Sequence, residues 1–307
     1  MFKTKWIDSW EAESKLRDWR FWYKLLAGIL VLIGITMNLS VELISLSDST
    51  PEDLRWSVWH TTYGSGETGI DYAGYLGNFF SYFTIQTNIL VAIWFFAAAF
   101  SHKQEGLNFI TKSKISYAVA TYITITCLIY NFLLLPTTLS MSKTGMDALT
   151  WTHQQILHTV VPILMVLYVC FFIKRDKTPT TKVFIKNNWW IYMIYPLLYG
   201  VFALIRGEMR YISDKPVSTQ YPYFFLNIHL NGKYGPDDYP IPGLSIPGWA
   251  WFLIAMSLVT FIAIGFSAIF NKIYFEMWFK DNYKDTLKKD KAKVIREINK
   301  EFIKQYK

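Results

Sequence analysis

Two side chains that could act as a nucleophile and a base lie within strongly apolar runs. Thr84 belongs to the run FFSYFTIQTN (79–88), and His158 belongs to the run LHTVVP (157–162). A threonine hydroxyl is a weak nucleophile that needs a base within hydrogen-bond reach, and neutral imidazole is the usual base. Polar groups inside membrane-spanning segments are costly and often functional. The pair therefore predicts acyl-transfer chemistry within a membrane.

The elements that must position this pair are membrane helices. Of the 307 residues, 52% are hydrophobic, and they gather in blocks close to or above the ~20 residues that cross ~30 Å of hydrocarbon. The fourth block is barely long enough, and the fifth contains Pro196. The sequence predicts an all-α, polytopic membrane protein with six transmembrane helices. The predicted spans are 21–39, 79–100, 115–139, 156–173, 189–206 and 249–271.

The net charge of +8 is unevenly placed along the chain. Lysine and arginine gather in 1–24, 101–114, 174–188 and 272–307, whereas the loop 40–78 holds one arginine against six acids. The positive-inside rule then predicts that both termini are cytoplasmic. The basic excess thus orients the protein, and we expect a membrane location with no nucleic-acid partner.

The charge and composition also divide the chain. We expect a cytoplasmic interfacial helix over 1–20, a six-helix transmembrane domain over 21–271 with outer loops 40–78 and 207–248, and a basic cytoplasmic tail over 272–307. The first span is followed by no small-residue cleavage motif, so it is interpreted as a retained helix. The loop 207–248 is rich in Pro and Tyr, and we expect it to fold back as a cap on the helices.

This topology brings several polar side chains to one depth near the outer leaflet. They are Thr84, His158, Thr87, Asn88, Asn131 and Arg206. Thr84, Thr87 and Asn88 share one helix face, which should point into the bundle. An amide of Asn88, Asn131 or Gln155 could orient the imidazole or donate to an oxyanion.

A purely structural interpretation of the same residues stays open. A threonine in a membrane helix commonly bonds the carbonyl four residues earlier, and an interfacial histidine is often structural. Arg206 could anchor a substrate carboxylate. It could equally extend to the membrane interface and pair with Glu208.

The sequence holds few other signals for chemistry. There is no Gly-x-Ser-x-Gly elbow and no His-Glu-x-x-His motif, and His153 and His158 are poorly spaced to share a metal on one helical face. No metal and no cofactor are expected.

Four motifs resemble one known family. They are YFTIQTN (82–88), LHTVVP (157–162), LIRG (204–207) and YPYFFL (221–226), in the order seen in the androgen-induced-gene-like family of multi-pass membrane proteins. The resemblance covers roughly 70–270 and is closest to the bacterial branch. Animal members are threonine hydrolases that cleave fatty acid esters of hydroxy fatty acids. The resemblance implies Thr84 as the nucleophile and His158 as the base, with Thr87 as a rival because the spacing to the following Asn differs.

These observations lead to one expected function and one alternative. We expect an integral-membrane lipid ester hydrolase in the bacterial plasma membrane, with a fatty-acyl ester as substrate and fatty acid esters of hydroxy fatty acids as the candidate class. The alternative is a non-catalytic protein that binds or transports lipid in the same cavity.

Overall fold

The structure is a computed structural model that describes residues 14–47, 56–59, 68–141, 145–230, 246–284 and 288–306. Within these ranges the regular secondary structure is helical except for one antiparallel strand pair, β1 (Ser57–Trp59) with β2 (Thr68–Ile70). The helices are α2 (Trp19–Ser47), α3 (Tyr72–Phe79), α4 (Phe83–Phe100), α5 (Ser113–Ile129), α6 (Leu135–Met141), α7 (Ala148–Gln155), α8 (Val161–Leu167), α9 (Thr181–Asn188), α10 (Ile191–Ile212), α11 (Val217–Gln220), α12 (Gly248–Asn282) and α13 (Lys288–Gln305).

Six helical segments in the described ranges are long and apolar enough to cross a membrane, which confirms the predicted all-α fold with six spans. They are Trp19–Leu46, Phe83–Phe100, Ser113–Leu139, Ala148–Phe172, Thr181–Ile212 and Gly248–Asn282. Several helices extend past the predicted blocks: α2 passes residue 39 and α12 passes residue 271. The fourth span begins at Ala148, since the Asp147 carboxylate caps it by accepting from two backbone N–H groups at 2.9 Å.

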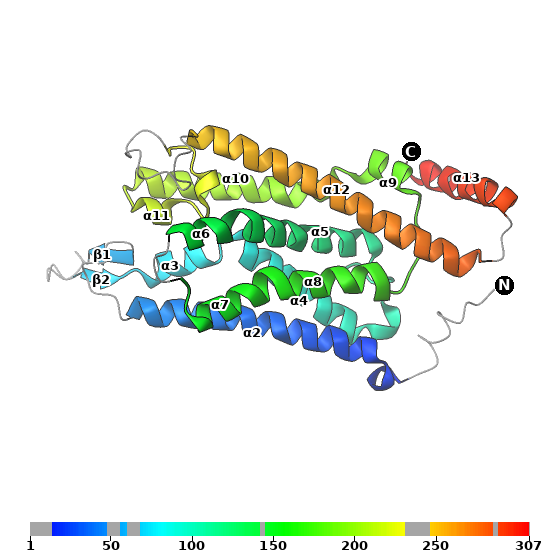
Figure 1. The fold of residues 1–307 in the computed structure, drawn as a ribbon, viewed down its shortest axis with the longest axis horizontal. Coiled ribbons are helices and arrows are strands. Elements are labelled where there is room, and N and C mark those ends of the chain that lie inside the picture. Colours follow the sequence, from blue (N-terminus) through cyan, green and yellow to red (C-terminus); the bar gives the residue numbers. More distant parts are fainter. Residues whose placement is uncertain are drawn as a thin grey trace.

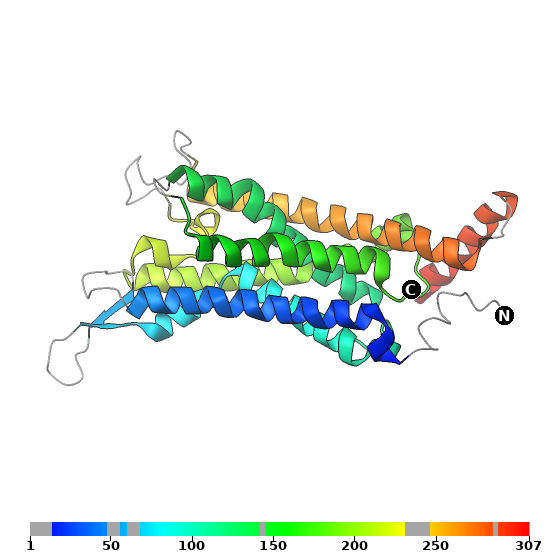
Figure 2. The same ribbon diagram turned by 60° about the horizontal axis from the view of Figure 1, so that its bottom comes forward.

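The spans form an elongated bundle (Figure 1). In both views α2 and α12 lie on opposite sides of the bundle (Figure 2). In Figure 1, α4, α5 and α8 lie between them. The strand pair, α3 and α11 gather at one end, near the start of α7. The beginning of α2 and the whole of α13 lie at the other end. This arrangement agrees with an even number of spans.

Parts of the predicted flanking regions fall on helices. Residues 1–13 of the predicted interfacial helix lie outside the described residues, and Lys15–Arg17 form a single 3-10 turn. In the predicted tail, α12 continues to Asn282 and α13 follows, with the buried Ile298 on its inner face. The predicted outer loop 207–248 begins as a continuation of α10 and then forms α11.

Buried charged groups join the beginning of α2 to the segment that follows α4. The Lys24 ammonium lies 2.5 Å from a Glu105 carboxylate oxygen and 2.9 Å from Nδ1 of His102. Nε2 of His102 lies 3.1 Å from the Asp18 carboxylate, which also binds the Arg20 guanidinium. A fully buried ammonium is tolerated only when it is paired in this way. The network therefore holds this end of the bundle together.

Candidate active site

Thr84 occupies the second position of α4. The helix begins at Phe83 after an extended Tyr82, and its first helical hydrogen bond runs from the N–H of Gln86 to the carbonyl of Tyr82. The N–H of Thr84 therefore has no partner within the helix, as in the first turn of any α-helix. The Thr84 side chain is buried. A hydroxyl and a helix-terminal N–H are thus presented at one point.

His158 lies in a distorted stretch of the fourth span. Residues Ile156–Val160 form a π-helical turn, and a second π-helical turn, Tyr130–Leu134, faces it from the third span. Such turns are rare and are frequently found at functional sites. The Tyr130 ring stacks on the His158 imidazole, with centroids 3.7 Å apart and planes inclined by 18°.

The Thr84 hydroxyl and the His158 imidazole are in hydrogen-bond contact. Thr84 Oγ1 lies 3.1 Å from His158 Nε2, and His158 Nδ1 lies 2.9 Å from the carbonyl oxygen of Gln154. A carbonyl can only accept, so Nδ1 carries the proton and Nε2 is left as an acceptor. The Thr84 hydroxyl then donates to Nε2. This is the arrangement that a base needs to take the proton of a nucleophile.

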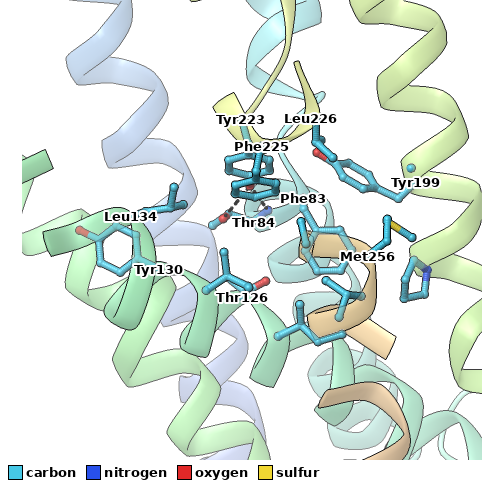
Figure 3. Close-up of a pocket in the computed structure, with 16 residues that line it drawn as sticks. Phe83, Thr84, Thr126, Tyr130, Leu134, Tyr199, Tyr223, Phe225, Leu226 and Met256 are labelled. Atoms are coloured by element: carbon cyan, nitrogen blue, oxygen red, sulfur yellow. Dashed lines mark hydrogen bonds between the residues drawn. The ribbon is translucent and has the colours of Figure 1, made fainter. Parts of the chain in front are cut away.

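Tyr223 completes the contacts of Thr84. Its hydroxyl lies 3.3 Å from Thr84 Oγ1 and accepts from the Thr84 N–H at 3.3 Å. The Tyr223 ring stacks on Phe225, with centroids 5.0 Å apart and planes inclined by 6° (Figure 3). Burial raises the pKa of Tyr223 to about 12, so the phenol keeps its proton at neutral pH. The aromatic loop predicted to cap the helices therefore reaches Thr84 itself.

Thr87 and Asn88 make contacts within the bundle. The Thr87 hydroxyl donates to the carbonyl of Thr84 at 3.1 Å and lies 2.8 Å from the Thr126 hydroxyl. The Asn88 amide donates to the carbonyls of Thr84 and Leu157 at 2.9 and 3.1 Å. These bonds join α4 to the third and fourth spans, and no described histidine contacts the Thr87 hydroxyl.

Asn131 and Arg206 likewise bind neighbouring protein groups. The Asn131 amide donates to the carbonyls of Cys127 and His158 at 2.9 and 3.3 Å, and these bonds join the two π-helical turns.

Arg206 donates to the Gln220 carbonyl at 3.0 Å and to the Asn78 side-chain oxygen at 2.8 Å. Arg206 thus braces α11 against α3, whereas the predicted pairing with Glu208 is replaced by these contacts. Glu208 instead contacts His229 at 2.6 Å. The Gln155 side chain accepts from Thr159 at 2.9 Å.

Thr84 lies where two cavities meet. One is apolar, has a volume of about 50 Å³, and is walled by α4, α5, α10, α12 and the segment 223–226 (Figure 3). The other has a volume of about 440 Å³, opens among α2, α3, α7 and α11, and contains His158, Gln154, Glu42 and Asn78 in its wall. Thr84, Tyr130, Leu134 and Tyr223 line both. An ester with its carbonyl at Thr84 would therefore have one half in apolar surroundings and the other half in polar surroundings.

Three residues of this site were absent from the sequence prediction: Tyr130, Gln154 and Tyr223. Tyr223 belongs to the quoted YPYFFL motif, and the crowding of Tyr and Pro in its loop was the available signal. Tyr130 directly precedes Asn131, but its position over His158 depends on a π-helical turn that the residue pattern does not indicate. In the described part of the chain, no three His, Cys, Asp or Glu side chains gather so that they could hold a metal ion.

The chain is distantly similar to proteins of Mycoplasma. The "Uncharacterized protein MG452 homolog" of Mycoplasma pneumoniae is 30% identical over 146 residues, which are 45% of this chain and 54% of that protein. The "Uncharacterized protein MG452" of Mycoplasma genitalium is 26% identical over 189 residues, which are 61% and 64% of the two lengths. The chain therefore spans less than two thirds of either relative.

No protein-family model matches the chain, and no solved structure matches it. Membership of the androgen-induced-gene-like family therefore stays a prediction. The bacterial relatives and the six apolar helices together describe a multi-pass membrane protein with bacterial homologues.

Proposed function

We propose that this protein is an integral-membrane hydrolase of lipid esters, with Thr84 as nucleophile and His158 as base. The observation that carries this proposal is the hydrogen bond from the Thr84 hydroxyl to an imidazole nitrogen left free to accept. That bond lies at the junction of an apolar cavity and a polar one. A fatty-acyl ester is the ligand whose two halves match those two cavities.

The reaction proceeds by an acyl-threonine intermediate. Thr84 Oγ1 attacks the ester carbonyl while His158 Nε2 takes the hydroxyl proton. The tetrahedral intermediate collapses as Nε2 returns that proton to the leaving alcohol, which departs through the polar cavity. A water from the same cavity then gives a proton to Nε2 as its oxygen attacks the acyl carbon. When the bond from that carbon to Thr84 Oγ1 breaks, Nε2 returns the proton to Oγ1, which releases the fatty acid and restores the Thr84 hydroxyl.

The oxyanion is stabilised at the first turn of α4. The Thr84 N–H and the Tyr223 hydroxyl lie beside the nucleophile and donate to the oxygen that becomes negative. The positive end of the α4 dipole lies at the same point. We assign the oxyanion donors to this pair, since the amides of Asn88 and Asn131 already donate to backbone carbonyls.

The imidazolium formed during the reaction has no carboxylate partner among the contacts of His158 in the described ranges. The Gln154 carbonyl accepts from Nδ1, and the face of the Tyr130 ring covers the imidazole. Both stabilise a positive charge, the first as an acceptor and the second through the ring quadrupole. The pair is thus a Thr–His dyad with a backbone orienting group.

We further propose a bacterial plasma membrane location with both termini cytoplasmic, which places Thr84 near the outer leaflet. The lysine-rich ends and inner loops support this orientation. The resemblance to the androgen-induced-gene-like family supports fatty acid esters of hydroxy fatty acids as the first substrates to test.

The test compares two threonines of α4 in the purified protein. Thr84→Val removes the hydroxyl and keeps the shape, and Thr87→Val is the matched control one turn away. We expect Thr84→Val to lower kcat for a long-chain ester by at least ~10³-fold and to abolish fluorophosphonate labelling. Thr84→Ser should keep part of the activity, and Thr87→Val should lower it only partly. A folded Thr84→Val protein with full turnover would exclude the proposal. A wild-type protein that binds lipid without labelling or turnover would favour lipid binding or transport.

A further inference from the structure

The apolar cavity beside Thr84 is separated from the outer surface of the bundle by a thin wall. On the other side of this wall a groove of about 430 Å³ runs between the third span and α12. Three residues line both the cavity and the groove: Ile129, Phe225 and Ala255. Each is at most 9% exposed, so these three side chains separate the cavity from the groove.

The groove consists of apolar side chains on membrane-spanning helices. Phe132 and Phe261 are 79% and 77% exposed, and Ile254 and Leu258 are also exposed. Among the described residues, no charged side chain lines the groove. The third span and α12 cross the membrane, so an apolar groove between them faces lipid acyl chains. Charged or hydrated ligands are excluded from that hydrocarbon. The occupant that matches the groove is therefore the acyl chain of a bilayer lipid.

The polar cavity offers a contrasting route. It reaches Thr84 from the end of the bundle that bears α3 and α11, and its wall includes Glu42, Asn78 and Gln154. Water and small soluble esters can approach by this side, whereas an acyl chain would leave hydrocarbon to do so at a cost of about 0.8 kcal/mol per methylene. The two halves of a lipid ester thus have separate paths to one carbonyl position.

We propose that a membrane-embedded acyl chain enters sideways between the third span and α12, displaces Phe225, and occupies the apolar cavity with its carbonyl at Thr84. This inference rests on the proposed hydrolysis and specifies the path and binding site of the acyl group. Phe225 is also stacked on Tyr223, so its displacement reaches the residue that contacts Thr84. The methyl end of the acyl chain then lies near Gly200 and Met256, which line the same cavity.

The first experiment narrows the passage. Ala255→Trp fills the wall between groove and cavity, and Leu258→Trp adds bulk from the exposed side of the groove. Ile269→Trp is the matched control, because Ile269 is 47% exposed on α12 and lines neither space. Two substrates are compared: a long-chain ester in phosphatidylcholine vesicles and the water-soluble ester p-nitrophenyl acetate.

We expect Ala255→Trp and Leu258→Trp to lower long-chain hydrolysis by about tenfold or more while acetate hydrolysis changes less than about twofold. Ile269→Trp should leave both unchanged. Equal losses for the two esters in the folded groove variants would overturn the lateral path. Absence of any Thr84-dependent hydrolysis of either ester would instead contradict the proposed function.

A second measurement needs no turnover. A diazirine-labelled fatty acid in the same vesicles is photolysed with the Thr84→Val protein, and the modified residues are mapped by mass spectrometry. We expect label on Leu226 or Val259 in the wall of the cavity, and loss of that label in the Thr84→Val protein that also carries Ala255→Trp. Label confined to the outer face of α12, or cavity labelling that persists after Ala255→Trp, would overturn the inference.

Discussion

The phenolic oxygen of Tyr223 lies 3.3 Å from the hydroxyl oxygen of Thr84 and 3.3 Å from its backbone nitrogen. The two residues come from distant parts of the chain, one at the start of α4 and one in the segment after α11. Because the Thr84 hydroxyl donates to His158, the Tyr223 hydroxyl donates to Thr84 in the resting protein. When Thr84 becomes acylated, that phenolic proton is available to the carbonyl oxygen.

This relationship predicts the effect of removing one oxygen atom. In Tyr223→Phe the ring keeps its stack on Phe225, but the oxyanion loses a donor. We expect kcat to fall by about 10²–10³-fold with little change in KM, because the donor acts in the transition state. Ester hydrolysis by the purified protein measures both constants.

Tyr221→Phe is the control for that measurement. Tyr221 lies two residues away and its hydroxyl contacts Glu208 at 3.4 Å, so its loss leaves Thr84 untouched. An unchanged kcat in Tyr223→Phe, or an equal fall in Tyr221→Phe, would contradict the role assigned to the Tyr223 hydroxyl.

The parts of this fold that could be predicted follow from the distribution of apolar residues along the chain. Blocks of apolar residues locate the six spans because hydrocarbon excludes unpaired backbone groups and favours helices. The predicted topology puts Thr84 and His158 at one depth. In the structure, Thr84 Oγ1 lies 3.1 Å from His158 Nε2. The ends of the spans were harder to predict. Helices such as α12 continue into charged sequence, where packing and capping decide at which residue the helix ends.

Other features depend on packing between distant segments. The π-helical turns at Tyr130 and His158 arise where two spans adjust to each other, so no residue period indicates them. The Tyr223–Thr84 contact depends on how an aromatic loop folds back. Arg206 shows a related difficulty: its position was predictable, whereas its partners Asn78 and Gln220 could be found only in the folded chain.

The orientation in the membrane gives a separate prediction. After Cys127 and Cys170 are replaced by Ala, single cysteines are introduced at Ser213 and Lys182, which lie exposed at opposite ends of the fifth span. We expect an impermeant thiol reagent to label the cysteine at 213 in intact cells and the one at 182 only after lysis, because lysines gather near 182. The opposite labelling pattern would reverse the topology and place Thr84 in the inner leaflet.

The buried network at the beginning of α2 makes stability depend on pH. Burial and the adjacent Lys24 ammonium lower the pKa of His102 from its ordinary value of 6.5 to about 4. As the pH falls from about 6.5 to about 4, the unfolded chain binds a proton at His102 that the folded protein does not, so the folded state loses stability. Asp18, whose pKa hydrogen bonds to Arg20 hold at about 2 despite burial, stays ionised across this window. We expect the Tm in detergent, followed by tryptophan fluorescence, to decrease over this range.

His102→Gln separates this contribution from the other titrations. The glutamine amide can still donate to Asp18, and its oxygen can still accept from Lys24, but the side chain does not titrate. The variant should therefore show a flatter decrease of Tm between about pH 6.5 and 4 than the wild type. If His102→Gln shows the same decrease of Tm with falling pH as the wild type, the acid sensitivity comes from groups other than His102.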